Sequence, residues 1–127
     1  MRGFSDILLV FVGGGAGSTV RFLLGRWVNT AHQTHFPFGT LTVNVVACLV
    51  LGFVVGIADH RQLISPAARL FWTVGFCGGF STFSTFSAET LTLIQGGLHL
   101  STILYIVLSL VLCLGATFGG IYLGEQG

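Results

Sequence analysis

The sequence predicts an all-α membrane protein, a single domain over residues 1–127 with four transmembrane helices, the third of them broken. Hydrophobic residues make up 53% of the chain and charged residues only 7%, against about 25% in soluble domains. Four apolar segments each approach the ~20 residues that cross ~30 Å of hydrocarbon. One segment contains a stretch rich in glycine and hydroxyl groups, residues 75–89, that is unsuited to a continuous helix. The composition excludes a soluble domain, and a net charge of +1 gives no basis for nucleic-acid binding.

The first apolar segment, residues 4–28, carries Gly13 and Gly17 at a spacing that lets two helix backbones approach closely. A phosphate-binding loop is excluded because no Lys-Ser/Thr pair follows these glycines. Arg21 lies late in the segment. Its side chain either extends to the membrane interface or places a positive charge at a vestibule that attracts an anion. The segment resembles a signal peptide, but three more apolar segments follow and favour a retained span.

The second segment, residues 37–58, has a polar face. Thr40 and Asn44 are four residues apart and therefore share one side of a helix. An amide cannot be satisfied by hydrocarbon, so Asn44 is expected to face the bundle interior or a cavity. A helix–helix contact and a polar path both remain open. Gly52 and Gly56 form a second close-packing pair.

The third segment, residues 66–94, begins with Ser65 as the predicted N-cap and Pro66 at the first helical position. Within residues 75–89, glycines are costly in a helix, and Ser and Thr offer the backbone competing hydrogen bonds. Broken backbone at membrane depth persists only where protein or a water-filled cavity surrounds it. We therefore expect a buried polar path here. Glu89, the only carboxylate deep in any segment, is a functional candidate, although the nearby helix end would also let it reach water.

The fourth segment, residues 98–122, carries Tyr105 and Ser109, again four residues apart. These two side chains share a helix face and are expected to line the polar path together.

The arginines give almost no preference for one orientation in the membrane. Arg2, Arg61 and Arg69 fall on one predicted side, and Arg21 and Arg26 on the other. Such a weak positive-inside bias permits insertion both ways round. One small chain also has few helices to enclose a path, so the sequence predicts an antiparallel, dual-topology homodimer.

The possible metal ligands do not form a recognisable site. His32 and His35 have no carboxylate or cysteine nearby in the sequence, which favours loop histidines at the membrane surface. Cys48, Cys77 and Cys113 all lie in apolar segments without a C-x-x-C spacing, and we expect them to be small buried side chains.

Three motifs, in this order along the chain, resemble those of the Fluc (CrcB) family of fluoride channels. They are GGGAGSTVR at 13–21, GTLTVN at 39–44 and GFCGGFSTFSTFSAET at 75–90. The resemblance extends over the whole chain, and the third motif is the most specific. It implies a passive, fluoride-selective channel that exports cytoplasmic fluoride across a bacterial inner membrane. It also implies an antiparallel dimer in lipid with two pores.

The resemblance also implies roles for individual residues. A structural sodium ion would lie on the two-fold axis, held by backbone carbonyls of Gly78 and Ser81 from each chain, and Arg21 would lie at the vestibule. Ser81 stands where the family more often has Thr, and Cys113 where some relatives carry a hydroxyl. Phe80 is expected to serve only in packing. The fluoride pore would be lined by Asn44, Phe83, Phe86, Ser84, Thr40, Tyr105, Ser109 and Glu89.

The chemistry of these residues fits fluoride. The ion is small and strongly hydrated, so hydrogen-bond donors must replace its water, and amide and hydroxyl groups supply them. The positive edge of a phenylalanine ring attracts an anion without trapping it as a full charge would.

Two other functions stay open at this point. A small dual-topology proton-coupled exporter would use Glu89 at its substrate site. A packing subunit of a larger membrane complex would conduct no ions when purified. Enzyme chemistry is not expected, because the sequence offers no nucleophile–base pair or metal-ligand cluster.

Overall fold

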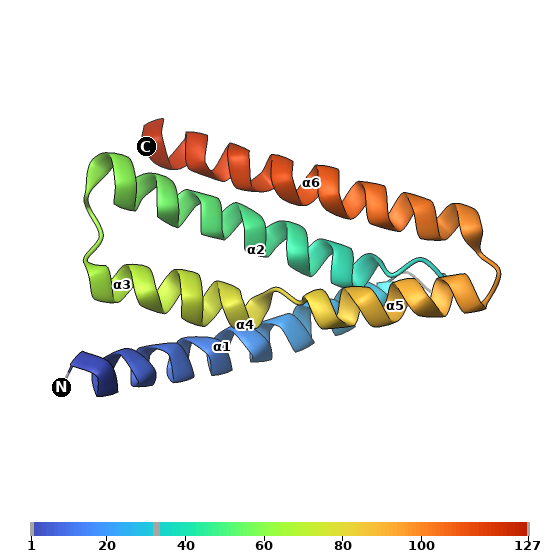
Figure 1. Cartoon of the computed structure of the whole chain (residues 1–127), viewed down its shortest axis with the longest axis horizontal. Coiled ribbons are helices and arrows are strands. Elements are labelled where there is room, and N and C mark those ends of the chain that lie inside the picture. The colour runs from blue at the N-terminus through green and yellow to red at the C-terminus, as the bar shows by residue number, and fades with distance from the viewer. Residues whose placement is uncertain (1, 32–33, 127) are drawn as a thin grey trace.

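The structure, a computed structural model, describes residues 2–31 and 34–126, and every regular element in these ranges is helical (Figure 1). Two elements, η1 and η2, are stretches with wider, π-type turns. The elements are α1 (Arg2–Ala31), α2 (Phe38–Gly56), η1 (Ile57–Arg61), α3 (Pro66–Leu70), η2 (Phe71–Cys77), α4 (Gly78–Phe80), α5 (Phe83–Gln95) and α6 (His99–Gln126).

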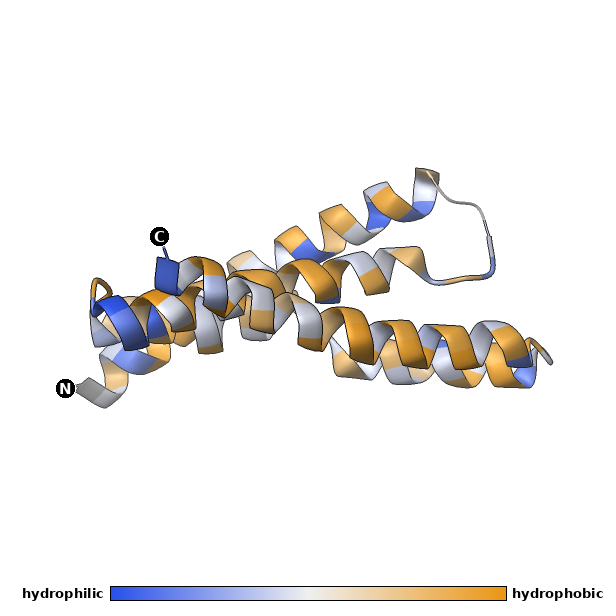
Figure 2. Ribbon diagram, turned by 90° about the horizontal axis from the view of Figure 1, so that it is seen from above, coloured by the Kyte–Doolittle hydropathy of each residue, from blue (hydrophilic) through white to orange (hydrophobic). Residues whose placement is uncertain are grey.

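Three helical stretches are long and apolar enough to cross a membrane. They are Gly3–Ala31, Phe38–Arg61 and His99–Gln126, and each extends a few residues beyond the predicted segment. The segment 66–95 consists of shorter helices and is not among them. The chain is therefore a multi-pass membrane protein. Apolar residues recur along the helices in Figure 2, interspersed with hydrophilic ones, and provide surface for contact with lipid.

Both predicted glycine pairs are sites of close helix packing, which confirms this prediction. A Cβ atom on Gly17 of α1 would lie 2.1 Å from the carbonyl oxygen of Phe76, so only glycine permits this contact with η2. A Cβ atom on Gly52 of α2 would lie 2.2 Å from the carbonyl oxygen of Thr117 in α6. Glycine at these positions lets the backbones touch, and the helices pack over a wide area.

Helices α2 and α6 run in the same direction (Figure 1). Gly120 of α6 lies against Leu49 of α2, and Gly124, one turn later, lies against Phe53. The contact advances by four residues on both helices. Side chains spaced by four on α2 therefore lie beside side chains spaced by four on α6, an arrangement on which the functional site depends.

The helical path is interrupted between α4 and α5. Ser81 (φ −80°, ψ 158°) and Thr82 (φ −150°, ψ 116°) are extended. Thr82 then caps α5, because its Oγ1 accepts a 3.1 Å hydrogen bond from the Thr85 N–H. The interruption falls inside the glycine- and hydroxyl-rich stretch, and Figure 1 shows it as the thin yellow segment before α5.

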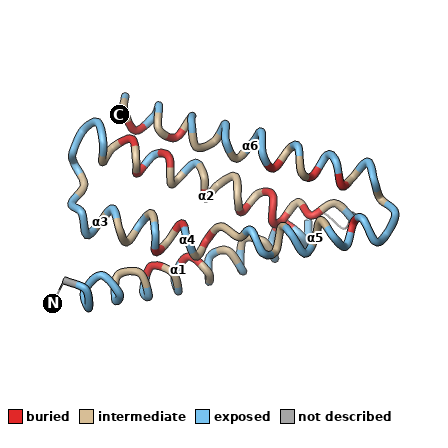
Figure 3. Tube along the Cα trace, in the orientation of Figure 1, coloured by how far each residue is buried: buried red, intermediate tan, exposed pale blue. Residues whose placement is uncertain are grey.

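The buried core is thin and lies along the inner faces of the helices (Figure 3). Phe80 is only 2% exposed and packs with Val43 and Ala47, which confirms its expected packing role. The start of the segment also agrees with prediction: Pro66 opens α3, and the Ser65 Oγ accepts a 3.1 Å hydrogen bond from the Ala68 N–H.

Charged contacts gather at the end of the molecule that holds both termini. Arg69 of α3 pairs with Asp59 at 2.5 Å, and His60 lies 2.9 Å from Glu125 of α6. These pairs are exposed and contribute little free energy.

Candidate ion pathway

The Asn44 side chain holds the interruption in place. Its Nδ2 donates to the Thr82 carbonyl at 3.1 Å, and its Oδ1 accepts from the Thr82 N–H at 2.8 Å. In a continuous α-helix the Thr82 N–H would reach the Gly78 carbonyl, four residues back. Asn44 takes that donor and so leaves the Gly78 carbonyl without its helical partner. The second N–H of the Asn44 amide is still available to a ligand.

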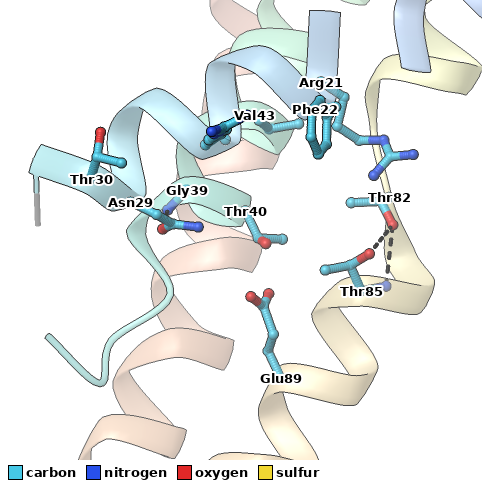
Figure 4. Close-up of a pocket in the computed structure, with 12 residues that line it drawn as sticks. Arg21, Phe22, Asn29, Thr30, Gly39, Thr40, Val43, Thr82, Thr85 and Glu89 are labelled. Carbon is cyan, nitrogen blue, oxygen red and sulfur yellow. Dashed lines mark hydrogen bonds between the residues drawn. The ribbon is translucent and has the colours of Figure 1, made fainter. Parts of the chain in front are cut away.

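Arg21 is tied to the same region from α1. Its Nε donates to the Gly79 carbonyl at 3.1 Å, and the Ser18 hydroxyl approaches the same oxygen at 3.4 Å. A positive charge here complements the carbonyl end of α4. The two interpretations from the sequence, a side chain reaching the interface or a charge at a vestibule, stay predictions, and the structure adds a third role. Through its hydrogen bond to Gly79, Arg21 stabilises the chain next to the interruption between α4 and α5. It also borders a cavity (Figure 4).

A cavity of about 510 Å³, here called the vestibule cavity, opens beside Arg21. Figure 4 shows Arg21 beside Thr82 and the Glu89 carboxylate pointing toward Thr40. The cavity therefore has basic and acidic walls, with hydroxyl groups between them. Its polar lining consists of Arg21, Arg26, Asn29, Thr30, Thr40, Thr82, Thr85 and Glu89.

Glu89 is fixed by the fourth long segment. The Tyr105 hydroxyl donates a 3.1 Å hydrogen bond to its Oε1, and Tyr105 also interacts with Thr40. Tyr105 is fully buried, and its ring lies 5.0 Å from that of Phe86. These contacts bring together three predicted pore residues, Thr40, Glu89 and Tyr105, of which Thr40 and Glu89 line the vestibule cavity.

A second cavity of about 260 Å³, here called the inner cavity, lies next to the interruption. It contains Ser109, which is 7% exposed and whose hydroxyl has no hydrogen-bond partner among the described residues. Other hydroxyls on α6 bond back to their own helix, as Thr102 does to Leu98 and Thr117 to Cys113. The lining consists of Asn44, Cys48, Ser81, Thr82, Phe83, Phe86, Ser109, Leu110, Cys113 and Leu114.

The two predicted phenylalanines lie side by side along this cavity. The rings of Phe83 and Phe86 have centroids 5.6 Å apart and an interplanar angle of 43°. Phe86 continues the row to Tyr105. Phe83 is 79% exposed in the single chain, so its outer side is open to another surface.

The remaining predicted residues lie outside these two cavities or only border one. Ser84 is exposed on α5, and its Oγ lies 3.4 Å from the Thr82 Oγ1. Gly78 and Ser81 line a smaller cavity of about 130 Å³ with Cys48. His32 lies outside the described residues. Across the part of the chain that is described, no three histidine, cysteine or carboxylate side chains gather as a metal site.

Several residues of the site were missed from the sequence, and three of them lie next to the interruption or the inner cavity or line the vestibule cavity. Thr82 is the partner of Asn44, Thr85 lines the vestibule cavity, and Cys48 lines the inner cavity. Helical spacing could have identified two of them. Thr85 precedes Glu89 by four residues and Cys48 follows Asn44 by four, so each shares a helix face with a predicted site residue.

Comparison with protein families assigns the sequence of this chain to a known family. The family model described as CrcB-like protein, Camphor Resistance (CrcB), matches residues 8–121. The chain belongs to the CrcB family. The match spans the glycine pairs, the interruption and both cavities.

Similar CrcB-family chains carry a functional name. The fluoride-specific ion channel FluC of Bacteroides fragilis is 42% identical over 124 residues, which cover 95% of this chain and 97% of that protein. The protein of the same name from Phocaeicola vulgatus is 42% identical over 120 residues, covering 94% and 98%. That from Chlorobium chlorochromatii is 43% identical over 120 residues, covering 94% and 89%. These names describe a channel rather than an enzyme, and they give no support to a proton-coupled exporter.

Proposed function

We propose that this chain is a subunit of a fluoride-selective channel that passively exports cytoplasmic fluoride across a bacterial inner membrane. The ion would pass from the vestibule cavity to the inner cavity beside Asn44, Phe83 and Phe86. The relatives named as fluoride-specific channels support the choice of ion.

The observation that carries the proposal is the unpartnered hydroxyl of Ser109. A buried hydroxyl without a partner costs free energy, and its own helix offers a carbonyl that neighbouring threonines use. Ser109 lines the inner cavity, so rotation of its side chain would let a passing ion there accept this hydrogen bond. Fluoride is a strong acceptor and fits a small cavity lined by a hydroxyl, an amide and ring edges.

The parallel course of α2 and α6 would provide a ladder of donors. Thr40 lies beside Tyr105, and one turn further Asn44 and Ser109 border the same cavity. An anion that leaves water needs donors in succession, each weak enough to release it. The free N–H of Asn44 and the Ser109 hydroxyl fulfil that condition, and the exposed Ser84 hydroxyl would join at the outer side of α5.

The open side of the site supports an antiparallel homodimer in lipid. Phe83 and the inner cavity lie open on the surface of one chain, so a second chain would close the pathway. Two chains related by a two-fold axis would form two such pathways. The interrupted segment 66–95 would then be the fourth span, protected at membrane depth by the partner.

A structural sodium ion fits the interruption. The Gly78 carbonyl has lost its helical donor to Asn44, and Ser81 is extended, so both oxygens are suited to a hard cation. One chain supplies two such oxygens, and the partner would supply two more. The bound ion would contribute positive charge near the anion path.

Efflux from liposomes tests the proposal. Purified protein is reconstituted, and fluoride and chloride release are followed with ion-selective electrodes. We expect rapid fluoride loss, retention of chloride and no dependence on a pH gradient. Fluoride retention by liposomes that contain inserted protein would refute the channel, and efflux that follows the proton gradient would favour an exporter with Glu89 at its centre.

A further inference from the structure

A thiol pair lies on the wall of the inner cavity. Cys48 follows Asn44 by one turn of α2, and Cys113 follows Ser109 by one turn of α6. Because these helices run parallel, the two cysteines reach the same level, and their thiols lie within interaction range of each other. Both also line the inner cavity. The cysteine pair therefore lies one helical turn beyond Asn44 and Ser109 along α2 and α6.

The surroundings of this pair determine which ligand it suits. Among the described residues that line the inner cavity, none is a histidine or a carboxylate, so the two thiols are its only side chains that ionise to bind a metal. Two neighbouring sulfur atoms on parallel helices that line one cavity match a soft metal ion that takes two sulfur ligands. The cavity of about 260 Å³ that both cysteines line provides the space for such an ion.

We propose that Cys48 and Cys113 form a two-thiolate site for soft metal ions such as mercury(II), and that an ion bound there closes the anion pathway. The second half of the inference rests on the proposed channel function. The first half, the metal site, rests only on the two cysteines and their cavity.

The binding step is an exchange of ligands without oxidation. Neutral mercuric chloride reaches the cavity from water or lipid, and each thiol loses its proton as sulfur replaces chloride. One metal ion thus releases two protons and two chloride ions and remains bound by two sulfurs. Metal binding to cysteine requires this deprotonation, so the reaction acidifies the medium.

The third cysteine provides a matched control. Cys77 of η2 is buried, 3% exposed, and does not line the inner cavity. It borders the smaller cavity of about 130 Å³ next to Gly78, a cavity that Cys48 also lines, so replacing Cys77 tests whether it takes part. Cys77→Ser removes a thiol from the chain and keeps the proposed pair.

The first experiment counts thiols in the purified full chain. One equivalent of mercuric chloride per chain is added, excess is removed, and free thiols are titrated after denaturation while intact mass is measured. We expect one retained mercury and a fall from three free thiols to one in the natural protein, and from two to none in Cys77→Ser. Three free thiols, or the same loss in Cys48→Ser, would overturn the site.

The second experiment measures flux from liposomes with and without mercuric chloride, each variant being compared with its own untreated sample. We expect near-complete loss of fluoride efflux in the natural protein and in Cys77→Ser, with recovery after addition of a dithiol. Cys48→Ser and Cys113→Ser are expected to keep their own untreated rates. Persistent inhibition in both variants would overturn block by the pair.

Together, the two experiments distinguish failure of the proposed channel function from failure of the proposed metal site. If untreated protein releases no fluoride, the channel function fails, and the thiol count still decides the metal site. If mercury occupies both thiols and fluoride efflux continues, the metal site is confirmed. The proposal that a metal ion bound there closes the anion pathway is then refuted.

Discussion

Replacing Asn44 with leucine tests whether this side chain stabilises the interruption between α4 and α5. The amide makes two hydrogen bonds to the Thr82 backbone, at 3.1 Å through Nδ2 and at 2.8 Å through Oδ1. Leucine has the same number and branching of side-chain heavy atoms and makes neither bond. Asn44→Leu therefore leaves an N–H and a carbonyl of an extended, part-buried residue without partners.

The expected loss follows from those two groups. A buried backbone group left without a partner costs about 1–3 kcal/mol, so two such groups cost about 2–6 kcal/mol. Part of this cost is avoided if Thr82 returns to a helical bond with Gly78, but that rearrangement straightens the segment and displaces Ser81 and Phe83 from the cavity. The variant is thus expected to lose stability, fluoride efflux, or both.

The assay is reversible unfolding in mixed micelles, together with efflux from liposomes. The matched control is Asn29→Leu, which removes one hydrogen bond, the 3.1 Å bond from the Gly39 N–H to Oδ1. Asn29 is exposed, so water replaces its carbonyl oxygen at the first turn of α2, and we expect a loss of at most ~1.5 kcal/mol. Equal unfolding free energies for Asn44→Leu and the natural protein, with unchanged efflux, would refute the bracing role.

Three further predictions follow from the packing and the pathway. Gly17→Ala should strongly reduce the yield and stability of folded protein, since its Cβ would lie 2.1 Å from the Phe76 carbonyl oxygen, whereas Gly15→Ala, with nothing within 4 Å, should unfold like the natural protein. Phe83→Ile and Phe86→Ile should each slow fluoride efflux several-fold, because a ring-edge contact contributes ~0.5–1.5 kcal/mol; unchanged rates in both would remove the ring-edge argument. Exchange of sodium for a large organic cation should lower the thermal stability of the purified protein, as loss of a bound ion does; an unchanged midpoint would count against the sodium site.

Several features could be predicted from the sequence because they depend on local composition. A charged fraction of 7% indicates the membrane class whatever the fold. Gly13 with Gly17, and Gly52 with Gly56, indicate surfaces where backbones touch. Ser65 before Pro66 indicates a helix start, because capping involves only adjacent residues.

The exact position of the interruption within residues 75–89 depends on contacts with residues far away in the sequence. Glycines and hydroxyls show where a helix is costly, but not which peptide leaves it. Thr82 is extended because Asn44, 38 residues away, offers its backbone a matched donor and acceptor. That pairing exists only after α2 has packed beside the segment, so no sequence pattern around Thr82 identifies its partner.

The pairing of residues on α2 and α6 is likewise a property of the tertiary structure. Spacing by four places Asn44 with Cys48 and Ser109 with Cys113 on their own helices. The packing of Gly52 against α6 sets the direction and register of the two helices, and so brings the thiols together and leaves the buried Ser109 hydroxyl without a partner among the described residues. Composition and periodicity thus determine which faces are polar, whereas the rotation and register of packed helices determine which polar groups meet, because those depend on contacts between residues far apart in the chain.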